Sequence, residues 1–234
     1  MKRIGLSMRI VDEAAYDESR DALAHDWARF LALALPDCQW TPIPNLGAKA
    51  AGFIQDWGLD GLVLTGGNDP GSSTLRDDTE NALVREALRR RLPLFGVCRG
   101  LQMIQRCFGG PLRGCPKDGH VATRHVVRFE RGSVEEGERT VNSYHALGVR
   151  PQDLAPELIA TALSADGWVE GLAHRGSPMA AVQWHPERNA VMDPLDARLL
   201  RDTLGLPSLS DASAASPRIV NTLSTPFSFP PCAP

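Results

Sequence analysis

The sequence predicts an α/β fold, in which a doubly wound, mainly parallel central sheet is flanked by helices and carries a small antiparallel extension. Strand-like and helix-like patterns alternate along the first half of the chain, and a glycine-rich loop at 65–71 follows one of the apolar runs. Right-handed crossovers between such units give a parallel sheet with its functional site at the carboxyl ends of the strands. The extension is predicted from the second half, where short strand-like segments replace this alternation.

The first half is expected to begin with a strand within 1–7 and a helix after 16–21, a segment rich in residues that cap helices. Pro36 ends this helix, whose buried face is expected at Leu23, Trp27, Phe30, Leu31 and Ala34. The elements that follow are an edge strand at 40–44, a weaker helix at 48–57 and a central strand at 59–64.

A further helix is predicted after the glycine-rich loop. Asp77 and Glu80 match a capping box at its start, and its buried stripe is expected at Leu83, Val84, Ala87 and Leu88. The last strand of this half is the apolar run before Cys98.

The second half contains five short segments that are typical of strands, at 123–129, 140–143, 158–165, 168–174 and 179–184. Asp166-Gly167 is a hairpin signal between two of them, and a last helix is expected at 194–204. From Pro207 onward the chain is rich in Ser, Ala and Pro. We therefore expect one domain over 1–206 and a disordered tail over 207–234.

Composition narrows the function classes. The chain has 234 residues with 43% hydrophobic content, enough for one sizeable core, and a formal net charge of only −3. No basic stripe and no run near the ~20 apolar residues of a spanning helix occur, so we expect no nucleic-acid or membrane partner and a cytoplasmic location. The five cysteines are irregularly spaced without a CxxC pair, which argues against disulfides and a zinc site, and no cofactor or metal is expected.

Cys98 lies where an apolar strand gives way to a helical pattern, between Gly96 and Gly100. Such a strand-to-helix turn is a nucleophile elbow, in which glycines on both sides allow close backbone approach. The helix N-terminus favours thiolate and offers free N–H groups to an oxyanion. The alternative is that Cys98 is a small buried hydrophobic residue, as free cysteines often are.

A thiol that attacks an amide needs a base, and the base needs an acceptor that orients its ring. His185 and Glu187 fit these roles, because Pro186 stiffens the turn between them. The strings G-x-C-x-G-x-Q at 96–102 and W-H-P-E at 184–187 resemble those of class I glutamine amidotransferases and their γ-glutamyl hydrolase relatives. This resemblance implies a flavodoxin-like core and a catalytic triad of Cys98, His185 and Glu187. The remaining histidines, apart from His145, are interpreted as structural.

Backbone N–H groups of Gly67 and Arg99 are the expected oxyanion donors. The resemblance implies that Gln102 helps to hold the γ-glutamyl group. It also implies that the segment 142–145 holds the α-amino and α-carboxylate ends of the substrate through Asn142, Ser143, Tyr144 and His145. The alternative for that segment is an ordinary polar strand end.

The sequence specifies the leaving group of the γ-glutamyl substrate less clearly than it specifies the catalytic residues. Segments like 142–145 and 76–80 occur in γ-glutamyl-γ-aminobutyrate hydrolases, whereas the pattern at 16–27 is similar to the γ-glutamyl-CDP-amidate hydrolase branch of bacterial capsule phosphoramidate biosynthesis. We favour the latter substrate, which would release L-glutamate and cytidine diphosphoramidate, with Arg9, Arg20 and Arg99 as candidates to bind its diphosphate. The short loop at 67–76 is expected to leave room for this bulky group.

Two other classes of function stay open. One is a glutaminase subunit that delivers ammonia to a separate synthetase. We expect water as the acceptor instead, because the sequence contains no fused synthase domain. The other is an inactive binding module, which the complete Cys98, His185 and Glu187 set disfavours. The sequence also leaves a homodimer open.

Overall fold

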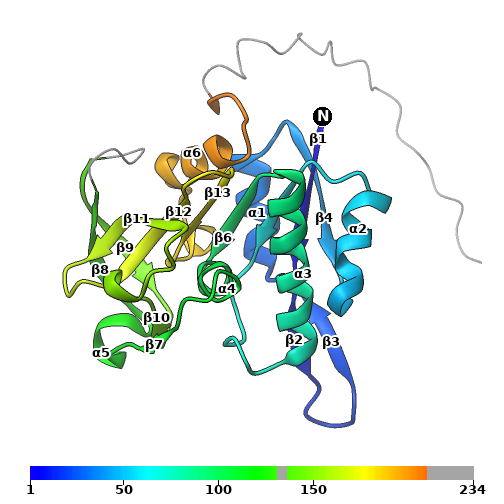
Figure 1. The fold of residues 1–234 in the computed structure, drawn as a ribbon, viewed down its shortest axis with the longest axis horizontal. Helices are drawn as coiled ribbons and strands as arrows, with labels where there is room; N and C mark the ends of the chain where they lie inside the picture. The colour runs from blue at the N-terminus through cyan, green and yellow to red at the C-terminus, as the bar shows by residue number, and fades with distance from the viewer. Residues whose placement is uncertain (131–135, 210–234) are drawn as a thin grey trace, which may run out of the picture.

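One sheet of nine strands organises the described part of the chain (Figure 1). The structure is a computed structural model and describes residues 1–130 and 136–209. Five parallel strands form one half of the sheet, in the order β4 (Cys38–Ile43), β1 (Lys2–Ser7), β5 (Gly61–Leu64), β6 (Leu94–Val97) and β13 (Met179–Val182). Four antiparallel strands continue it, in the order β12 (Val169–His174), β11 (Leu158–Ser164), β8 (Thr123–Phe129) and β9 (Gly137–Ser143).

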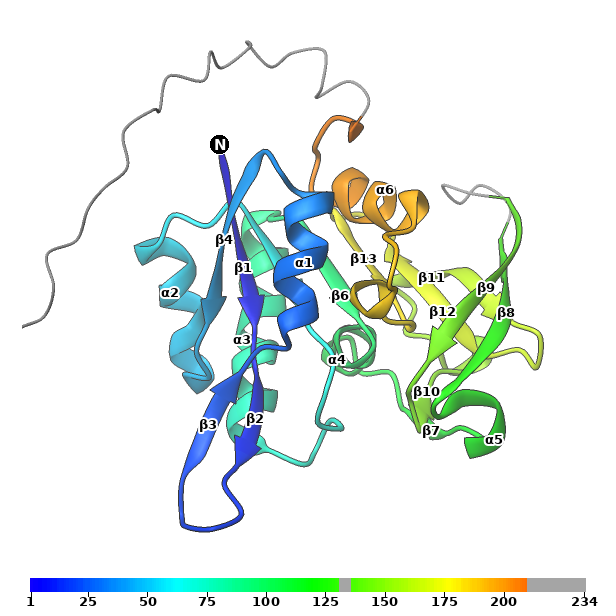
Figure 2. The same ribbon diagram turned by 180° about the vertical axis from the view of Figure 1, so that it is seen from behind.

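Helices cover both faces of the parallel half, as Figures 1 and 2 show from opposite sides. The helices on one face are α1 (His25–Ala34) and α6 (Pro194–Thr203), and those on the other are α2 (Ala50–Asp56), α3 (Thr74–Arg90) and α4 (Arg99–Cys107). A hydrophobic core lies between the sheet and the helices on each face. Neighbouring strand residues alternate between these two cores, with Val63 in the core beneath α1 and α6 and with Leu62 and Leu64 in the core beneath α2, α3 and α4. Strands covered on both sides need apolar residues at every position, which is why the central strands read as continuous apolar runs. The predicted fold class is confirmed.

The strand order reverses at β1, because the chain passes from β1 outward to β4 and then back to β5 on the other side. The connections after β1 and β5 therefore leave the sheet in opposite directions. Such a switch point opens a crevice at the carboxyl ends of the strands. The loops after β1, β5, β6 and β13 all reach this edge of the sheet.

The antiparallel extension joins the edge of the parallel sheet through β13 and β12. The strands predicted for this half are present, and Asp166 and Gly167 connect β11 to β12 as the hairpin signal indicated. The short elements β7 (Arg113–Gly114), α5 (Lys117–His120) and β10 (Leu147–Gly148) were not predicted.

The segment expected to cap the first helix forms a hairpin instead. Its strands are β2 (Arg9–Asp12) and β3 (Ser19–Ala22), and α1 begins only at His25. The prediction was wrong because Ser, Asp and Glu satisfy turns and strand ends as readily as helix starts. Here the Asp21 carboxylate accepts hydrogen bonds from the backbone and side-chain nitrogens of Asn45, which tie β3 to the loop after β4. The hairpin follows β1 and stands beyond its carboxyl end (Figure 2).

The start of α3 also differs from the prediction. The helix begins at Thr74 with Ser73 as its N-cap, one turn before the supposed capping box. Asp77 and Glu80 lie inside the helix and bind Arg99, so their spacing serves a tertiary contact. Leu83, Val84 and Ala87 are buried as expected, whereas Leu88 is exposed.

The predicted disordered tail at 207–234 lies outside the described residues from position 210 onward. Pro207, which is described, accepts a hydrogen bond from the Arg201 guanidinium. In the described ranges, no helix has the length and apolar character needed to cross a membrane.

Candidate active site

Cys98 occupies the turn between β6 and α4 and has φ 53° and ψ −101°. This backbone conformation is costly for a residue with a side chain, and tight packing around the turn maintains it. A Cβ at Gly100 would lie 2.5 Å from the Leu64 carbonyl oxygen, and one at Gly96 would lie 2.8 Å from the Gly100 carbonyl carbon. The two glycines therefore permit the sharp turn, as the nucleophile-elbow interpretation requires.

His185 follows β13, and Glu187 lies two residues later on the 3₁₀ turn η3 (Pro186–Arg188). The His185 Nδ1 atom is 2.7 Å from Glu187 Oε1, and both side chains are buried. The loop after β5 closes over this pair, because a Cβ at Gly66 would lie 2.5 Å from His185 Cε1 and 3.5 Å from Cys98 Cβ. The structure thus brings the three predicted residues to one place, and only glycine fits between them.

The protonation of His185 follows from this environment. Burial by itself lowers the pKa of the imidazole, but the neighbouring Cys98 sulfur and the Glu187 carboxylate outweigh it and raise the pKa of His185 to about 9. At neutral pH the ring is therefore protonated, between the Cys98 sulfur and the Glu187 carboxylate. A proton held there can be donated to a leaving amine.

Asn142 positions His185 rather than reaching a ligand. Its Oδ1 accepts a hydrogen bond from the His185 backbone N–H at 2.9 Å, and its Nδ2 donates to the His185 carbonyl oxygen at 2.8 Å. The same Nδ2 also donates to Asn189 Oδ1 at 3.1 Å. Because its amide is fully engaged, Asn142 holds the backbone of His185 and differs from the substrate-binding role expected of it.

The other residues expected to bind substrate lie in different environments. The Ser143 hydroxyl donates to the His120 carbonyl oxygen at 2.7 Å, and His145 lies in a separate buried cluster. The Gln102 side chain donates to the Leu147 carbonyl oxygen at 2.8 Å. Tyr144 is exposed and meets the His185 ring edge-on, with centroids 5.7 Å apart. A substrate role therefore stays a prediction for Tyr144 and Gln102, while Ser143 and His145 are committed elsewhere.

A buried ion network lies behind the glycine-rich loop. Arg76 donates to the carbonyl oxygens of Thr65 and Gly66, each at 3.0 Å, and pairs with Glu80. The other Glu80 oxygen accepts from Arg99 Nε at 2.8 Å. Glu80 therefore connects the loop over His185 to the residue that follows Cys98, a function that the sequence pattern did not reveal.

This network corrects one expectation for Arg99. Its guanidinium is buried, pairs with Glu80 and Asp77, and donates to the Asn68 carbonyl oxygen. It is therefore not available to a substrate phosphate. The backbone N–H of Arg99, at the first position of α4, has no partner within the helix and stays a predicted oxyanion donor together with that of Gly67.

We expect Glu80→Gln to lower the free energy of unfolding by about 3–5 kcal/mol, because it leaves two buried guanidinium groups without their shared carboxylate. Urea denaturation measures this change. Glu86→Gln is the matched control, since Glu86 lies in the same helix and pairs with the exposed Arg89, where a change within about 1 kcal/mol is expected. Equal losses in the two variants would contradict this account of the network.

A small cavity adjoins His185 and Glu187 and is also lined by Arg9, Trp27, Gly67 and Arg188. Arg9 lies against Gly67, where a Cβ would be 3.2 Å from its Nε atom. No salt bridge involves Arg9 within residues 1–130 and 136–209, whereas Arg20 pairs with Glu13 and Glu18 on the hairpin. Of the three predicted phosphate-binding arginines, Arg9 is thus the one that is both beside the site and without a carboxylate partner.

Comparison with known proteins agrees with this geometry. The sequence matches the Peptidase C26 family over residues 42–187, a span that includes Cys98, His185 and Glu187. The chain is 28% identical to a γ-glutamyl-CDP-amidate hydrolase of Campylobacter jejuni over 79% of its length and 90% of that protein. It is 32% identical to the γ-glutamyl-γ-aminobutyrate hydrolase PuuD of Escherichia coli over 56% of its length and 65% of that protein.

The fold has solved counterparts. A putative GMP synthase component from Thermoplasma acidophilum superimposes with a TM-score of 0.64 and 23% identity, over 92% of this chain and 97% of the other. The family match covers more than half of the chain and includes the elbow and the His185 turn. The chain therefore belongs to the Peptidase C26 family of class I glutamine amidotransferase-like proteins, and it is a hydrolase that acts on amide bonds.

Proposed function

We propose that the chain hydrolyses a γ-glutamyl amide through a thioester on Cys98. The observation that carries the proposal is the placement of Cys98 on the strained elbow beside a buried His185–Glu187 pair. The match to Peptidase C26 and the two γ-glutamyl hydrolase relatives support the same reaction class.

In the first half of the reaction, the Cys98 sulfur attacks the γ-carbonyl carbon and forms a C–S bond. The carbonyl oxygen becomes an oxyanion, for which the backbone N–H groups of Gly67 and Arg99 are the proposed donors. When the C–N bond breaks, the leaving nitrogen takes the proton held by the His185 imidazolium. The amine product departs and the γ-glutamyl group stays on sulfur.

In the second half, the neutral His185 accepts a proton from water as the water oxygen attacks the thioester carbon. The C–S bond then breaks, and L-glutamate leaves with Cys98 as thiolate and His185 as imidazolium. Glu187 takes no proton in this scheme. It keeps the His185 Nδ1 hydrogen in place, so that Nε2 exchanges the proton in both halves.

The favoured substrate is γ-glutamyl-CDP-amidate, whose diphosphate gives Arg9 a natural partner. Arg9 lines the cavity next to His185, and arginine binds phosphate oxygens in a bidentate manner. The similarity to the Campylobacter jejuni enzyme over most of both chains supports this choice. The similarity to PuuD, at a comparable identity over a shorter part of the chain, supports γ-glutamyl-γ-aminobutyrate as a second candidate substrate.

Steady-state kinetics with the purified chain separate these candidates. We expect kcat/KM for γ-glutamyl-CDP-amidate to exceed that for γ-glutamyl-γ-aminobutyrate and for L-glutamine by about tenfold or more. A higher value for the aminobutyrate compound would replace the proposed substrate. Glutaminase activity that rises on adding a synthetase would identify an ammonia-delivering protein instead.

Arg9→Met is expected to raise KM for γ-glutamyl-CDP-amidate by about tenfold or more, because a charged hydrogen-bonded pair is lost. KM for L-glutamine, which lacks the diphosphate, should change by less than about twofold. Arg20→Met provides the control, since Arg20 already pairs with Glu13 and Glu18 on the same hairpin. If Arg9→Met weakened both substrates equally, Arg9 would instead contact the shared glutamyl part.

A further inference from the structure

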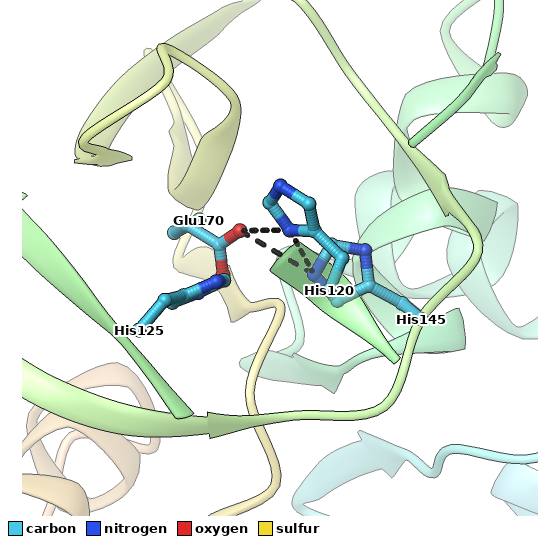
Figure 3. Close-up of side chains that lie close together, drawn as sticks. All are labelled: His120, His125, His145 and Glu170. Carbon is cyan, nitrogen blue, oxygen red and sulfur yellow. Dashed lines mark hydrogen bonds and ion pairs between the residues drawn. The ribbon is translucent and has the colours of Figure 1, made fainter. Parts of the chain in front are cut away.

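Three histidines and one glutamate from separate elements meet in the antiparallel half of the protein (Figure 3). His120 ends α5, His125 lies on β8, His145 lies between β9 and β10, and Glu170 lies on β12. One potential ligand atom from each lies within 4.8 Å of all the others. None of the four belongs to the proposed Cys98, His185 and Glu187 triad.

In each histidine one ring nitrogen, here called the inner nitrogen, lies near Glu170. The other, the outer nitrogen, forms a hydrogen bond outside the cluster. His125 Nδ1 is 3.0 Å from the Gly119 carbonyl oxygen, and His145 Nδ1 is 3.0 Å from the Leu147 carbonyl oxygen. A carbonyl oxygen only accepts, so these nitrogens carry hydrogen. His120 Nε2 is 3.1 Å from the Asp166 carboxylate, which is likewise an acceptor. In a neutral ring, the inner nitrogen of each histidine is therefore left with a lone pair.

The inner nitrogens face Glu170. The Glu170 side chain is fully buried, and neither of its carboxylate oxygens has a hydrogen-bond partner within the described chain. His125 Nε2 is 3.3 Å from Oε2, and His145 Nε2 and His120 Nδ1 are 3.4 Å and 3.7 Å from Oε1. With all three rings neutral, a buried carboxylate that faces three lone pairs is unfavourable unless a cation compensates it.

We propose that His120, His125, His145 and Glu170 form a binding site for a structural zinc ion. Four ligand atoms about 2.0–2.1 Å from a tetrahedral Zn²⁺ lie about 3.3 Å from one another. His120 Nδ1, His145 Nε2 and Glu170 Oε1 already approach this spacing, at 3.4–3.7 Å from one another. His125 Nε2 is 3.3 Å from the other carboxylate oxygen, Oε2, and the four ligand atoms all lie within 4.8 Å of one another. Imidazole nitrogens favour zinc over Mg²⁺ or Ca²⁺, which prefer oxygen ligands.

The surroundings match those of an established kind of metal site. Ligating histidines commonly bond their second nitrogen to a carboxylate or backbone carbonyl, as all three do here. Four protein ligands leave no open position for water, which indicates a structural ion. It would join α5, β8, β12 and the loop after β9, the strand that carries Asn142. Cysteine spacing, the basis on which no zinc was expected, carries no information about a site made by four distant segments.

The test is the zinc content of the full-length chain, prepared without a histidine tag and dialysed after incubation with ZnSO₄. We expect about one equivalent per chain in the parent protein and in Cys98→Ala, and the melting temperature should rise by about 5 °C or more relative to chelator-treated protein. A content below about 0.1 equivalent, with no effect of zinc on melting, would overturn the proposal and assign the cluster to protonated histidines paired with Glu170.

Variants locate the ion. His125→Ala removes the most exposed ligand of the cluster, whose side chain is 14% exposed, and should lower the zinc content at least about tenfold. His25→Ala is the control, since His25 is exposed at the start of α1 and should leave zinc content unchanged. Cobalt(II) substitution of the parent protein provides a readout that does not depend on the stability of a variant. A tetrahedral spectrum supports the site, and an octahedral spectrum overturns it.

Discussion

Cys98→Ala is expected to lose turnover by about 10⁵-fold or more, because it removes the atom that forms the thioester. The fold should be retained, since alanine meets the same backbone strain at φ 53° and fits the space of the thiol. Turnover of the γ-glutamyl substrate and the melting temperature together measure this. Mass spectrometry of quenched parent enzyme should reveal a γ-glutamyl adduct on Cys98 that the variant lacks.

Other cysteines serve as controls for this prediction. Burial raises the pKa of the Cys107 thiol, and burial together with nearby Glu170 raises that of Cys115 to about 12. Both are therefore protonated and weakly nucleophilic at neutral pH. Cys107→Ala and Cys115→Ala should keep activity within about threefold of the parent. Substantial turnover by Cys98→Ala would rule out the proposed mechanism.

The second large effect is expected at the histidine. His185→Asn should lower kcat by about 10⁴-fold or more, since it removes the imidazole that carries the proton between the leaving amine and water in the proposed mechanism. Glu187→Gln should retain at least about tenfold more activity, because a carboxamide oxygen can still accept the Nδ1 hydrogen and hold the ring. Rates for both variants that equal the parent rate would remove this pair from the mechanism.

The pH dependence of kcat/KM is an independent test of the His185–Glu187 pair. Because the pKa of His185 is raised to about 9, kcat/KM should fall as pH rises through about 9, where the imidazolium loses the proton intended for the leaving amine. Glu187→Gln removes one of the charges that raise this pKa, so the alkaline limb should move to lower pH. An alkaline limb that did not move would exclude His185 as the titrating group.

The raised pKa of His185 also makes the free energy of unfolding depend on pH. The pKa of His185 in the folded protein, about 9, lies above its usual value of 6.5. The contribution of the protonated ring to the free energy of unfolding is therefore fully present below pH 6.5 and is lost as pH rises through about 9. Glu187→Gln should therefore flatten the decline of the melting temperature over this range. This readout is independent of substrate.

Much of the fold was predictable because its signals are local. Continuous apolar runs identified β5 and β6, and the Asp166-Gly167 pair identified the turn between β11 and β12. The errors arose where one pattern serves two purposes. Ser19 and its neighbours suit a helix cap and a hairpin equally, and the Asp77–Glu80 spacing suits a capping box as well as an ion network.

The sequence by itself determined the α/β class, the elbow at Cys98 and the His185–Glu187 turn, since each depends on residues adjacent in the chain. Tertiary structure alone decided which polar groups meet across the chain. It directed Asn142 to the backbone of His185, buried Arg99 against Glu80, and gathered three histidines around Glu170. The physical reason is that a buried polar side chain must find a partner, while its identity is set by which segments the packed sheet brings together.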